Sequence, residues 1–323
     1  MDSLTQATLG AVIGEILLGK KIGNKGAVLG GIIATIPDLD VVLLPFYSNI
    51  EKISVHRGLS HSILFSFIGA FLIALILSKI KWTRQVSYLR LWIFSWLTLF
   101  THILLDAFTT YGTQLFLPFS NYRVSFDSIN IVDPFYTMPL LIGLTLSLTL
   151  YRNRKNSVLF SKIGLLISTL YLATTIGIKS YVTQKFDTQL KAQNISYKKL
   201  LTVPVKIGSV YWYGVAKTNN SLFIGKYNNQ TQNQISFTEF PINDYLLDTI
   251  DTELATTLKW FSKDFYTVAE FNGKIRLYNM QCDMQGIRTF GDYKAPTAFY
   301  FEITPISNGK YELNTGMHQK NTK

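Results

Sequence analysis

The segment His56-Arg57-Gly58-Leu59-Ser60-His61-Ser62 leads directly into an apolar run from Ile63 to Leu77. Two imidazoles therefore lie five residues apart where the chain is about to enter lipid, although the sequence holds only 4 histidines among 323 residues. Imidazole nitrogens are ligands for zinc, iron and other transition metals. The segment predicts a membrane helix with metal-binding side chains at its polar end.

Two other apolar runs carry side chains of the same kind. His102 and Asp106 are one helical turn apart, so a helix places them on one face. In the second apolar run Pro37 removes a backbone donor, and we expect Asp38 and Asp40 to lie in an unwound or capping stretch. Three segments thus bring candidate ligands into or beside hydrophobic sequence.

The composition divides the chain into a membrane part and a soluble part. Hydrophobic residues make up 48% of the sequence and charged residues 16%, and the long uncharged runs lie before residue 180. We expect an α-helical polytopic membrane bundle in residues 1–179, followed by a soluble, mainly β (α+β) domain in residues 180–323. About six transmembrane helices are predicted, over Leu4–Gly19, Gly26–Leu44, His61–Ile80, Leu91–Phe108, Ile131–Tyr151 and Leu159–Ile178.

The first two predicted helices carry a spacing that favours close packing. GxxxG occurs at Gly10–Gly14 and again at Gly26–Gly30, and such glycines let two helices approach closely. Glu15 lies near Lys20, and we interpret it as half of a structural ion pair. The N-terminus lacks the basic region and cleavage site of a signal peptide, so we expect the first helix to be retained.

The basic residues predict the orientation in the membrane. Loops after the first, third and fifth helices, with their flanks, hold Lys20, Lys21, Lys25, Lys79, Lys81, Arg84, Arg90, Arg152, Arg154, Lys155 and Lys162, whereas the opposite loops hold Lys52, Arg57 and Arg123. This bias predicts a multi-pass protein of the cytoplasmic (inner) membrane with extracytoplasmic termini. It also accounts for the net charge of +11 without a nucleic-acid partner. All the candidate ligands then fall on the extracytoplasmic face.

The soluble part has two strong hairpin signals. Val210–Lys217 and Leu222–Tyr227 flank Asn219-Asn220, while Phe265–Phe271 and Lys274–Met280 flank Asn272-Gly273. Tyr245–Phe261 has the apolar spacing of a helix. We find no catalytic constellation in this part, and we expect His318, in the polar tail, to be solvated.

The intramembrane polar residues are best satisfied together by a cation. Burying a carboxylate near hydrocarbon costs a few kcal/mol unless it is paired. The predicted metal ligands are Asp38, Asp40, His56, His61, His102 and Asp106. Cys282 is the single cysteine, which excludes a cysteine-based zinc site and an intrachain disulfide, and mixed His and Asp ligation suits Zn²⁺ first, with Mn or Fe as alternatives.

Other polar residues on the same face suggest catalytic roles. Asp40 or Asp127 is expected to act as a base, and Arg57 or Arg123 to hold a phosphate by charge-assisted hydrogen bonds, although either arginine equally suits a lipid headgroup or a carboxylate. Ser60 precedes His61 at an expected helix start, so we interpret it as an N-cap.

Five stretches carry a family resemblance. They are Met1-Asp2-Ser3-Leu4-Thr5-Gln6, Pro37-Asp38-Leu39-Asp40, His56–Ser62, His102-Ile103-Leu104-Leu105-Asp106 and Asp133-Pro134. Together they resemble the YdjM-like inner-membrane metal-dependent hydrolases over roughly residues 1–150. The resemblance implies a bacterial or archaeal integral membrane protein whose matching Asp and His positions are metal ligands. The C-terminal β domain has no counterpart in the short members.

We therefore expect a membrane-embedded, metal-dependent hydrolase with its site at the extracytoplasmic face, acting on a membrane lipid or lipid-linked phosphoester. A metal-dependent membrane protease or acyl hydrolase is the alternative among enzymes. A non-catalytic metal-binding or transport protein of the membrane is the alternative of another class. The β domain is expected to lie outside the cytoplasm and to cover or border the site.

Overall fold

The computed structural model divides the chain into two compact units. It describes residues 1–152, 156–205, 207–228, 230, 234–281, 288–290, 293–295, 299–306 and 311–317; Arg154, Lys155, Cys282 and His318 lie outside these ranges. The first unit comprises Met1–Leu44 and Val55–Gly177, and the second comprises Pro45–Ser54 and Ile178–Lys323.

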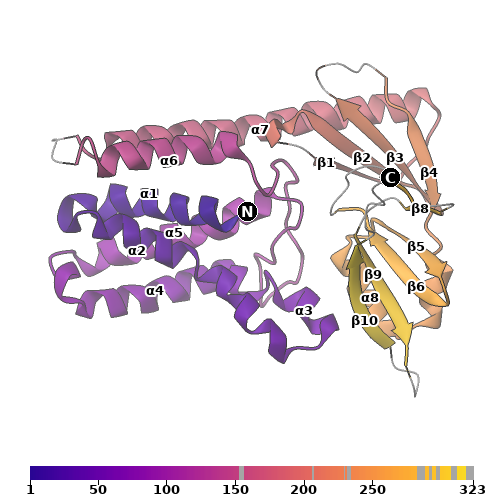
Figure 1. Cartoon of the computed structure of the whole chain (residues 1–323), viewed down its shortest axis with the longest axis horizontal. Coiled ribbons are helices and arrows are strands. Elements are labelled where there is room, and N and C mark those ends of the chain that lie inside the picture. The colour runs from indigo at the N-terminus through magenta and orange to yellow at the C-terminus, as the bar shows by residue number, and fades with distance from the viewer. Residues whose placement is uncertain are drawn as a thin grey trace. The chain divides into compact units, whose positions relative to one another are not determined.

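The first unit is a helical bundle. Its helices are α1 (Ser3–Ile22), α2 (Lys25–Ala34), α4 (Ile63–Lys79), α5 (Tyr88–Phe108), α6 (Pro134–Leu148) and the first part of α7 (Leu159–Ala192). Figure 1 shows α1, α2, α4, α5 and α6 running side by side. Short 3-10 helices connect them: η1 (Pro37–Val42), η2 (Leu44–Phe46), η3 (Leu59–His61) and η4 (Lys81–Thr83). The sequence did not predict the short helix α3 (Asn49–Val55), which begins in the second unit.

The two GxxxG stretches pack against each other, as predicted. A Cβ added to Gly14 would overlap the backbone carbonyl of Gly26, and one added to Gly10 would overlap that of Gly30. Any larger side chain at these positions would separate α1 from α2. The bundle core forms around this contact from buried apolar side chains such as Val12, shared among the helices.

The predicted six spans are not confirmed. Within the described ranges, α5 and α7 are each long and apolar enough to cross a membrane, and two bent pairs raise the number of candidate spans to four if each pair is one span. These pairs are α2 with Pro37–Phe46, bent by 46°, and Asn49–His61 with α4, bent by 55°. α6 has 15 residues, or about 22 Å at 1.5 Å per residue, which is short of a hydrocarbon core of about 30 Å.

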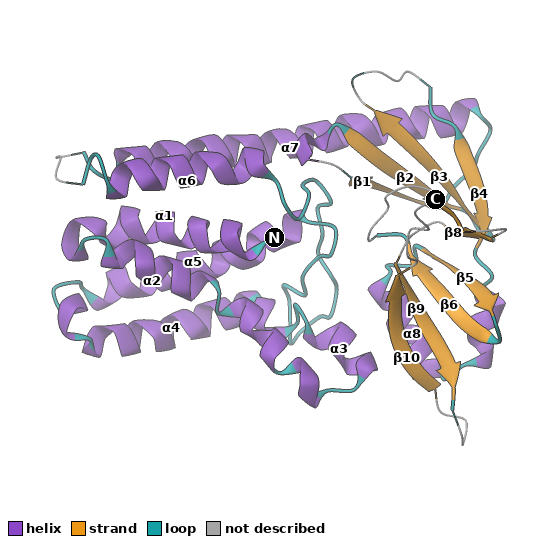
Figure 2. Ribbon diagram, in the orientation of Figure 1, coloured by secondary structure: helices purple, strands orange, loops and turns teal. Residues whose placement is uncertain are grey.

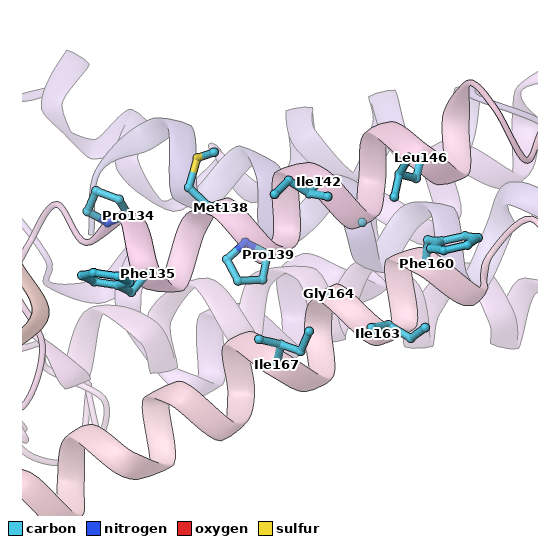
Figure 3. Close-up of a pocket in the computed structure, with 11 residues that line it drawn as sticks. Pro134, Phe135, Met138, Pro139, Ile142, Leu146, Phe160, Ile163, Gly164 and Ile167 are labelled. Carbon is cyan, nitrogen blue, oxygen red and sulfur yellow. The ribbon is translucent and has the colours of Figure 1, made fainter.

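α6 and α7 frame an apolar groove on the first unit. The groove has a volume of about 500 Å³, and its walls include Phe135, Ile142 and Phe160 (Figure 3). The two helices meet where a Cβ on Gly143 would overlap the carbonyl of Phe160. Because the side chains that line the groove are apolar, its surface suits the bilayer interior.

Glu15 forms an ion pair, but its partner is not the neighbouring Lys20. The Arg152 guanidinium, beyond the end of α6, bonds to the Glu15 carboxylate and donates to the carbonyl of Gly19 at 2.8 Å. Glu15 is fully buried whereas Lys20 is exposed. The long Arg152 side chain reaches the buried Glu15 carboxylate from the loop after α6. Lys20, although close to Glu15 in the sequence of α1, is exposed at the surface.

The second unit contains two four-stranded antiparallel sheets, which Figure 2 shows in orange. One sheet has the order β1-β2-β3-β4, and the other has the order β10-β9-β6-β5. The strands are β1 (Lys199–Pro204), β2 (Tyr211–Lys217), β3 (Ser221–Asn228), β4 (Phe237–Pro241), β5 (Tyr266–Phe271), β6 (Lys274–Asn279), β9 (Phe299–Pro305) and β10 (Tyr311–Met317), with a separate pair β7 (Arg288–Phe290) and β8 (Tyr293–Ala295).

Both predicted hairpins are confirmed. β2 pairs with β3 across Asn219-Asn220, and β5 pairs with β6 across Asn272-Gly273. Asn272 and Gly273 have φ values of 52° and 73°, which are the left-handed conformations that a type I′ turn requires. The predicted helix Tyr245–Phe261 is split: a 3-10 helix, η6 (Asp244–Thr249), precedes α8 (Thr252–Phe261), because Asp251 caps α8 through Glu253 and Leu254 amides.

α7 is longer than predicted. The expected span ends at Ile178, but the helix continues to Ala192. Val182 and Phe186, one turn apart, are fully buried against Trp212 of β2. One face of this extension is apolar and packs on the sheet, but the extension as a whole is too polar to be predicted as a membrane span. Hydropathy alone therefore predicted the end of the helix at Ile178 instead of Ala192.

Candidate metal centre

Three separate segments place four polar side chains at one end of the bundle. Pro37 begins η1 and so turns the chain out of α2, which carries Asp38 to the cluster. η3 carries His61 immediately before α4 begins. The last turns of α5 carry His102 and Asp106, which share one helix face as predicted.

The four side chains offer ligand atoms that all lie within 4.8 Å of one another. His61 Nε2 is 3.4 Å from Asp38 Oδ1 and 3.3 Å from Asp106 Oδ2. His102 Nε2 is 3.5 Å from the same Asp38 oxygen and 3.7 Å from the same Asp106 oxygen. The side chains of both histidines are fully buried and that of Asp106 is 1% exposed, whereas that of Asp38 is 30% exposed.

These atoms face one another without bonding to one another. Among the described residues, His61 Nε2, His102 Nε2 and Asp106 Oδ2 are buried and have no hydrogen-bond partner. Orphaned buried polar atoms are rare because each costs about 1–3 kcal/mol. A cation bound between them would satisfy all of these atoms at once, so the cluster could hold a metal ion.

The start of α1 supports the Asp106 carboxylate from the other side. Gln6 Nε2 donates to Asp106 Oδ1 at 3.1 Å and to the His102 carbonyl at 3.2 Å, and the α-amino group of Met1 also bonds to Oδ1. Oδ1 is therefore engaged while Oδ2 is directed at the cluster. Sequence reasoning gave Gln6 no role, because only the packing of α1 on α5 brings it to this site.

Asp40 and His56, two of the six predicted ligands, lie outside the group of four. Asp40 Oδ1 is 3.1 Å from His56 Nδ1, while Oδ2 accepts the Arg57 amide at 2.9 Å and the Ser60 hydroxyl at 3.1 Å. Both Asp40 oxygens are thus engaged behind the His61 ring. Asp38 and Asp40 diverge because they lie two residues apart in η1, where side chains at that spacing point in different directions.

The predicted N-cap role of Ser60 is wrong. The N-cap of α4 is Ser62, whose hydroxyl accepts the amide of Phe65 at 3.0 Å. Ser60 lies in η3, where its Oγ is 3.0 Å from His61 Nδ1 in addition to its bond to Asp40. The extra 3-10 turn moves the helix start two residues later than the sequence indicates.

Buried Arg57 lies beside the cluster, and a second buried arginine, Arg123, contacts the same tyrosine as Arg57. Arg57 Nη2 is 3.4 Å from Asp106 Oδ1, and its Nη1 donates to the Thr109 hydroxyl at 3.2 Å. The Arg57 and Arg123 guanidinium carbons lie 4.9 Å and 4.7 Å from the centre of the Tyr111 ring, at cation–π distance. The sequence did not single out Tyr111.

Asp127 is placed near the end of α5 rather than among the four ligands. Its Oδ1 accepts the Ser125 hydroxyl at 2.8 Å, and the amides on either side of it, those of Phe126 and Ser128, donate to Ala107 and Phe108 carbonyls. Its backbone has a positive φ of 46°.

Two known bacterial proteins are similar in sequence to part of this chain. The chain is 34% identical over 142 residues to the uncharacterized protein YfhP of Bacillus subtilis (strain 168), with 42% of each chain covered. It is 34% identical over 109 residues to the inner membrane protein YbcI of Escherichia coli (strain K12), covering 34% of this chain and 61% of YbcI. The chain thus spans about half the length of these relatives, and no solved structure matches it.

The matched family covers the whole of the first unit. A sequence profile of the YdjM inner membrane protein family matches residues 1–182, which include every member of the four-residue cluster and both buried arginines. The match extends over more than half of the 323 residues. The chain therefore belongs to the YdjM inner membrane protein family.

Proposed function

We propose that this membrane protein is a metal-dependent hydrolase of a lipid or lipid-linked phosphoester. The observation that carries the proposal is the convergence of Asp38, His61, His102 and Asp106 beside the buried Arg57 guanidinium. Two carboxylates, two imidazoles and a neighbouring cation form a site for a divalent metal and an anion together.

The mixed donor set of two imidazoles and two carboxylates suits Zn²⁺ first. Ligands about 2.0–2.1 Å from a tetrahedral zinc are about 3.3–3.4 Å apart. Neighbouring ligands around an octahedral Mg²⁺ at a similar radius are only about 2.8–3.0 Å apart. The four histidine–carboxylate separations run from 3.3 to 3.7 Å, near the tetrahedral value, while the set as a whole extends over as much as 4.8 Å. Mn and Fe remain alternatives because imidazole and carboxylate ligands suit them too.

The two arginines support a phosphate in the substrate. Arg57 is held by Asp106 and Thr109, yet its buried Nε has no hydrogen-bond partner among the residues the structure describes. Arg123 shares the Tyr111 ring with it. Guanidinium groups bind phosphate oxygens through paired N–H donors, so Arg57 and Arg123 would orient an anionic group toward the cluster.

The surface around the cluster supports a substrate that arrives in lipid. Leu39, between Asp38 and Asp40, is 55% exposed, and Leu59, two residues before His61, is 57% exposed. The Ile63 amide at the start of α4 donates to the Leu115 carbonyl, beside the 48% exposed Phe116. Large exposed apolar side chains interleaved with ligand segments suit hydrocarbon better than water.

The residues divide the chemical work as follows. A bound divalent metal supplies Lewis acidity and a water activated for attack. Asp38 is the best-placed base, because its carboxylate is partly exposed at the cluster whereas both oxygens of Asp40 are engaged. Arg57 offsets negative charge as the phosphoester is cleaved. Asp127, which bonds Ser125, has the weaker geometric case as a base.

The loop charges support an extracytoplasmic site. Under that orientation, the soluble domain, residues 180–323, also lies outside the cytoplasm.

One observation favours a second candidate. A tetrahedral zinc with four protein ligands is typical of a structural site, whereas catalytic zinc keeps an open position. If Asp38 remains a ligand throughout, the cluster is a non-catalytic clip that joins η1, η3 and α5. A catalytic centre would instead need Asp38 to serve as a base toward substrate, with His61, His102 and Asp106 holding the metal.

The decisive experiment combines metal analysis with product screening. Purified protein is loaded with Zn²⁺, Mn²⁺ or Fe²⁺ and incubated with a membrane lipid extract, and released phosphate esters, fatty acids and peptides are measured. Wild type should bind one equivalent and release a phosphorylated product, whereas His61→Ala should do neither and Asp38→Asn should keep the metal and lose turnover. Release of fatty acid or peptide would indicate the acyl hydrolase or the protease instead. One equivalent of bound metal without any released product would support the non-catalytic structural site.

A further inference from the structure

Behind the proposed metal ligands, Asp40, Ser60 and His61 form a chain of hydrogen bonds. Ser60 Oγ is 3.1 Å from Asp40 Oδ2 and 3.0 Å from His61 Nδ1. Asp40 Oδ2 and His61 Nδ1 are 3.6 Å apart, too far for a direct hydrogen bond. The serine hydroxyl therefore bridges the carboxylate and the ring.

Counting protons fixes the direction of this chain. An ionised carboxylate only accepts, and a serine hydroxyl has a single proton to donate. Ser60 gives that proton to Asp40, so its oxygen must accept from His61. Nδ1 therefore carries a proton, and in the neutral ring Nε2 then carries a free lone pair.

The other side of the ring agrees with this assignment. Nε2 lies 3.3 Å from Asp106 and 3.4 Å from Asp38, yet it forms no hydrogen bond to any described residue. A protonated Nε2 would be expected to donate to one of these two carboxylates. Nε2 instead points its lone pair into the cluster.

We infer that Asp40 and Ser60 are positioning residues that hold His61 in its Nδ1–H tautomer and aim its Nε2 at the metal. The inference rests on the proposed metal site and assigns a role to two side chains outside the ligand set. Metal-bound histidines commonly donate their second ring nitrogen to a carboxylate, directly or through another group, and loss of that partner weakens metal binding by about 10–100-fold.

Asp40 is itself held in place by the polypeptide. It accepts the backbone amide of Arg57 at 2.9 Å, and its second oxygen lies 3.1 Å from His56 Nδ1. The segment that carries Ser60 and His61 thus also carries two groups that fix the carboxylate. His56, although part of the same sequence motif, acts in this arrangement on Asp40 rather than on the metal.

The second histidine of the cluster lacks such support. His102 Nδ1 is buried and, within the part of the chain that the structure describes, has no hydrogen-bond partner. The protein therefore fixes the tautomer of His61 but not that of His102. This asymmetry predicts that removing one hydroxyl affects one of the two histidines selectively.

The tautomer can be measured without any metal. Because the chain has only 4 histidines, selective ¹⁵N-histidine labelling gives an NMR spectrum that single His→Ala variants can assign. In metal-free wild type, His61 should be protonated at Nδ1, and in Ser60→Ala it should become a mixture of tautomers. A wild-type His61 protonated at Nε2 would overturn the inference.

Zinc affinity provides the second measurement. With Zn²⁺ alone as the probe in competition with a chromophoric chelator, Ser60→Ala and Asp40→Asn should bind about 10–100-fold more weakly than wild type. Ser60→Thr keeps the hydroxyl and should retain the affinity. Ser66→Ala is the matched control, because that buried hydroxyl donates to the Ile63 carbonyl of its own helix.

The outcomes separate this inference from the proposed hydrolase. Unchanged zinc affinity in Ser60→Ala would overturn the positioning role even if the protein is an active hydrolase. Weaker binding in Ser60→Ala, rescued by Ser60→Thr, would sustain that role even if no product is ever released. A wild type that binds no metal would overturn the metal site and the role together.

Discussion

Removal of the metal should measurably destabilise the helical unit. Asp38 and Asp106 offer oxygens within 4.8 Å of each other, and two unit charges at that distance repel by about 3.5 kcal/mol at an effective dielectric constant of 20. Arg57, 3.4 Å from Asp106, and the α-amino group of Met1 offset part of this repulsion, so about 2–3 kcal/mol should be lost without the dication. For a unit of this size that corresponds to a decrease of about 4–12 °C in melting temperature.

The assay is thermal unfolding of detergent-solubilised protein with and without a chelator. The melting temperature of the wild type should fall by this amount in chelator and recover when Zn²⁺ is added. His102→Ala should melt low under both conditions, because one ligand is missing and metal no longer binds tightly. Ser66→Ala is the matched control, since its buried hydroxyl donates to the Ile63 carbonyl of its own helix and the zinc response should persist.

Two results would refute this reasoning. An unchanged wild-type melting temperature in chelator, with metal loss verified by elemental analysis, would mean that the two carboxylates do not need a cation. A full zinc response in His102→Ala would show that the stabilising metal binds elsewhere.

Three further predictions concern the packing, the orientation and the soluble unit. Gly14→Leu should separate α1 from α2 and lower the melting temperature more than Gly177→Leu, because a side chain at Gly14 meets backbone whereas Gly177 has open space; equal effects would contradict the GxxxG contact. Alkaline phosphatase fused after Lys323 should be active and green fluorescent protein fused there should be dark, whereas the reverse pattern would place the site at the inner leaflet. The hydrogen bond from Lys274, together with Arg276, holds the pKa of Glu302 below its ordinary value. Glu302 therefore contributes stability above pH of about 4 that is lost as pH falls further, so unfolding scans should show a smaller acid loss in Glu302→Gln than in wild type.

The sequence by itself determined the elements that depend on local pattern. Helical spacing placed His102 and Asp106 on one face, and GxxxG identified the contact between α1 and α2. Asn272-Gly273 located a hairpin because few residue pairs adopt two successive left-handed conformations. These inferences succeed because period, turn chemistry and residue size act within a few neighbouring residues.

Only the tertiary structure decided which candidates meet. Asp38 and Asp40 differ little in sequence, yet one faces His61 Nε2 and the other lies behind the ring, bridged by Ser60. Gln6 reaches Asp106 across 100 positions of sequence. No local pattern encodes such contacts, because they depend on the angle at which separate helices cross and on where each one ends. The same dependence explains why Ser62 rather than Ser60 caps α4, and why hydropathy misplaced the end of α7.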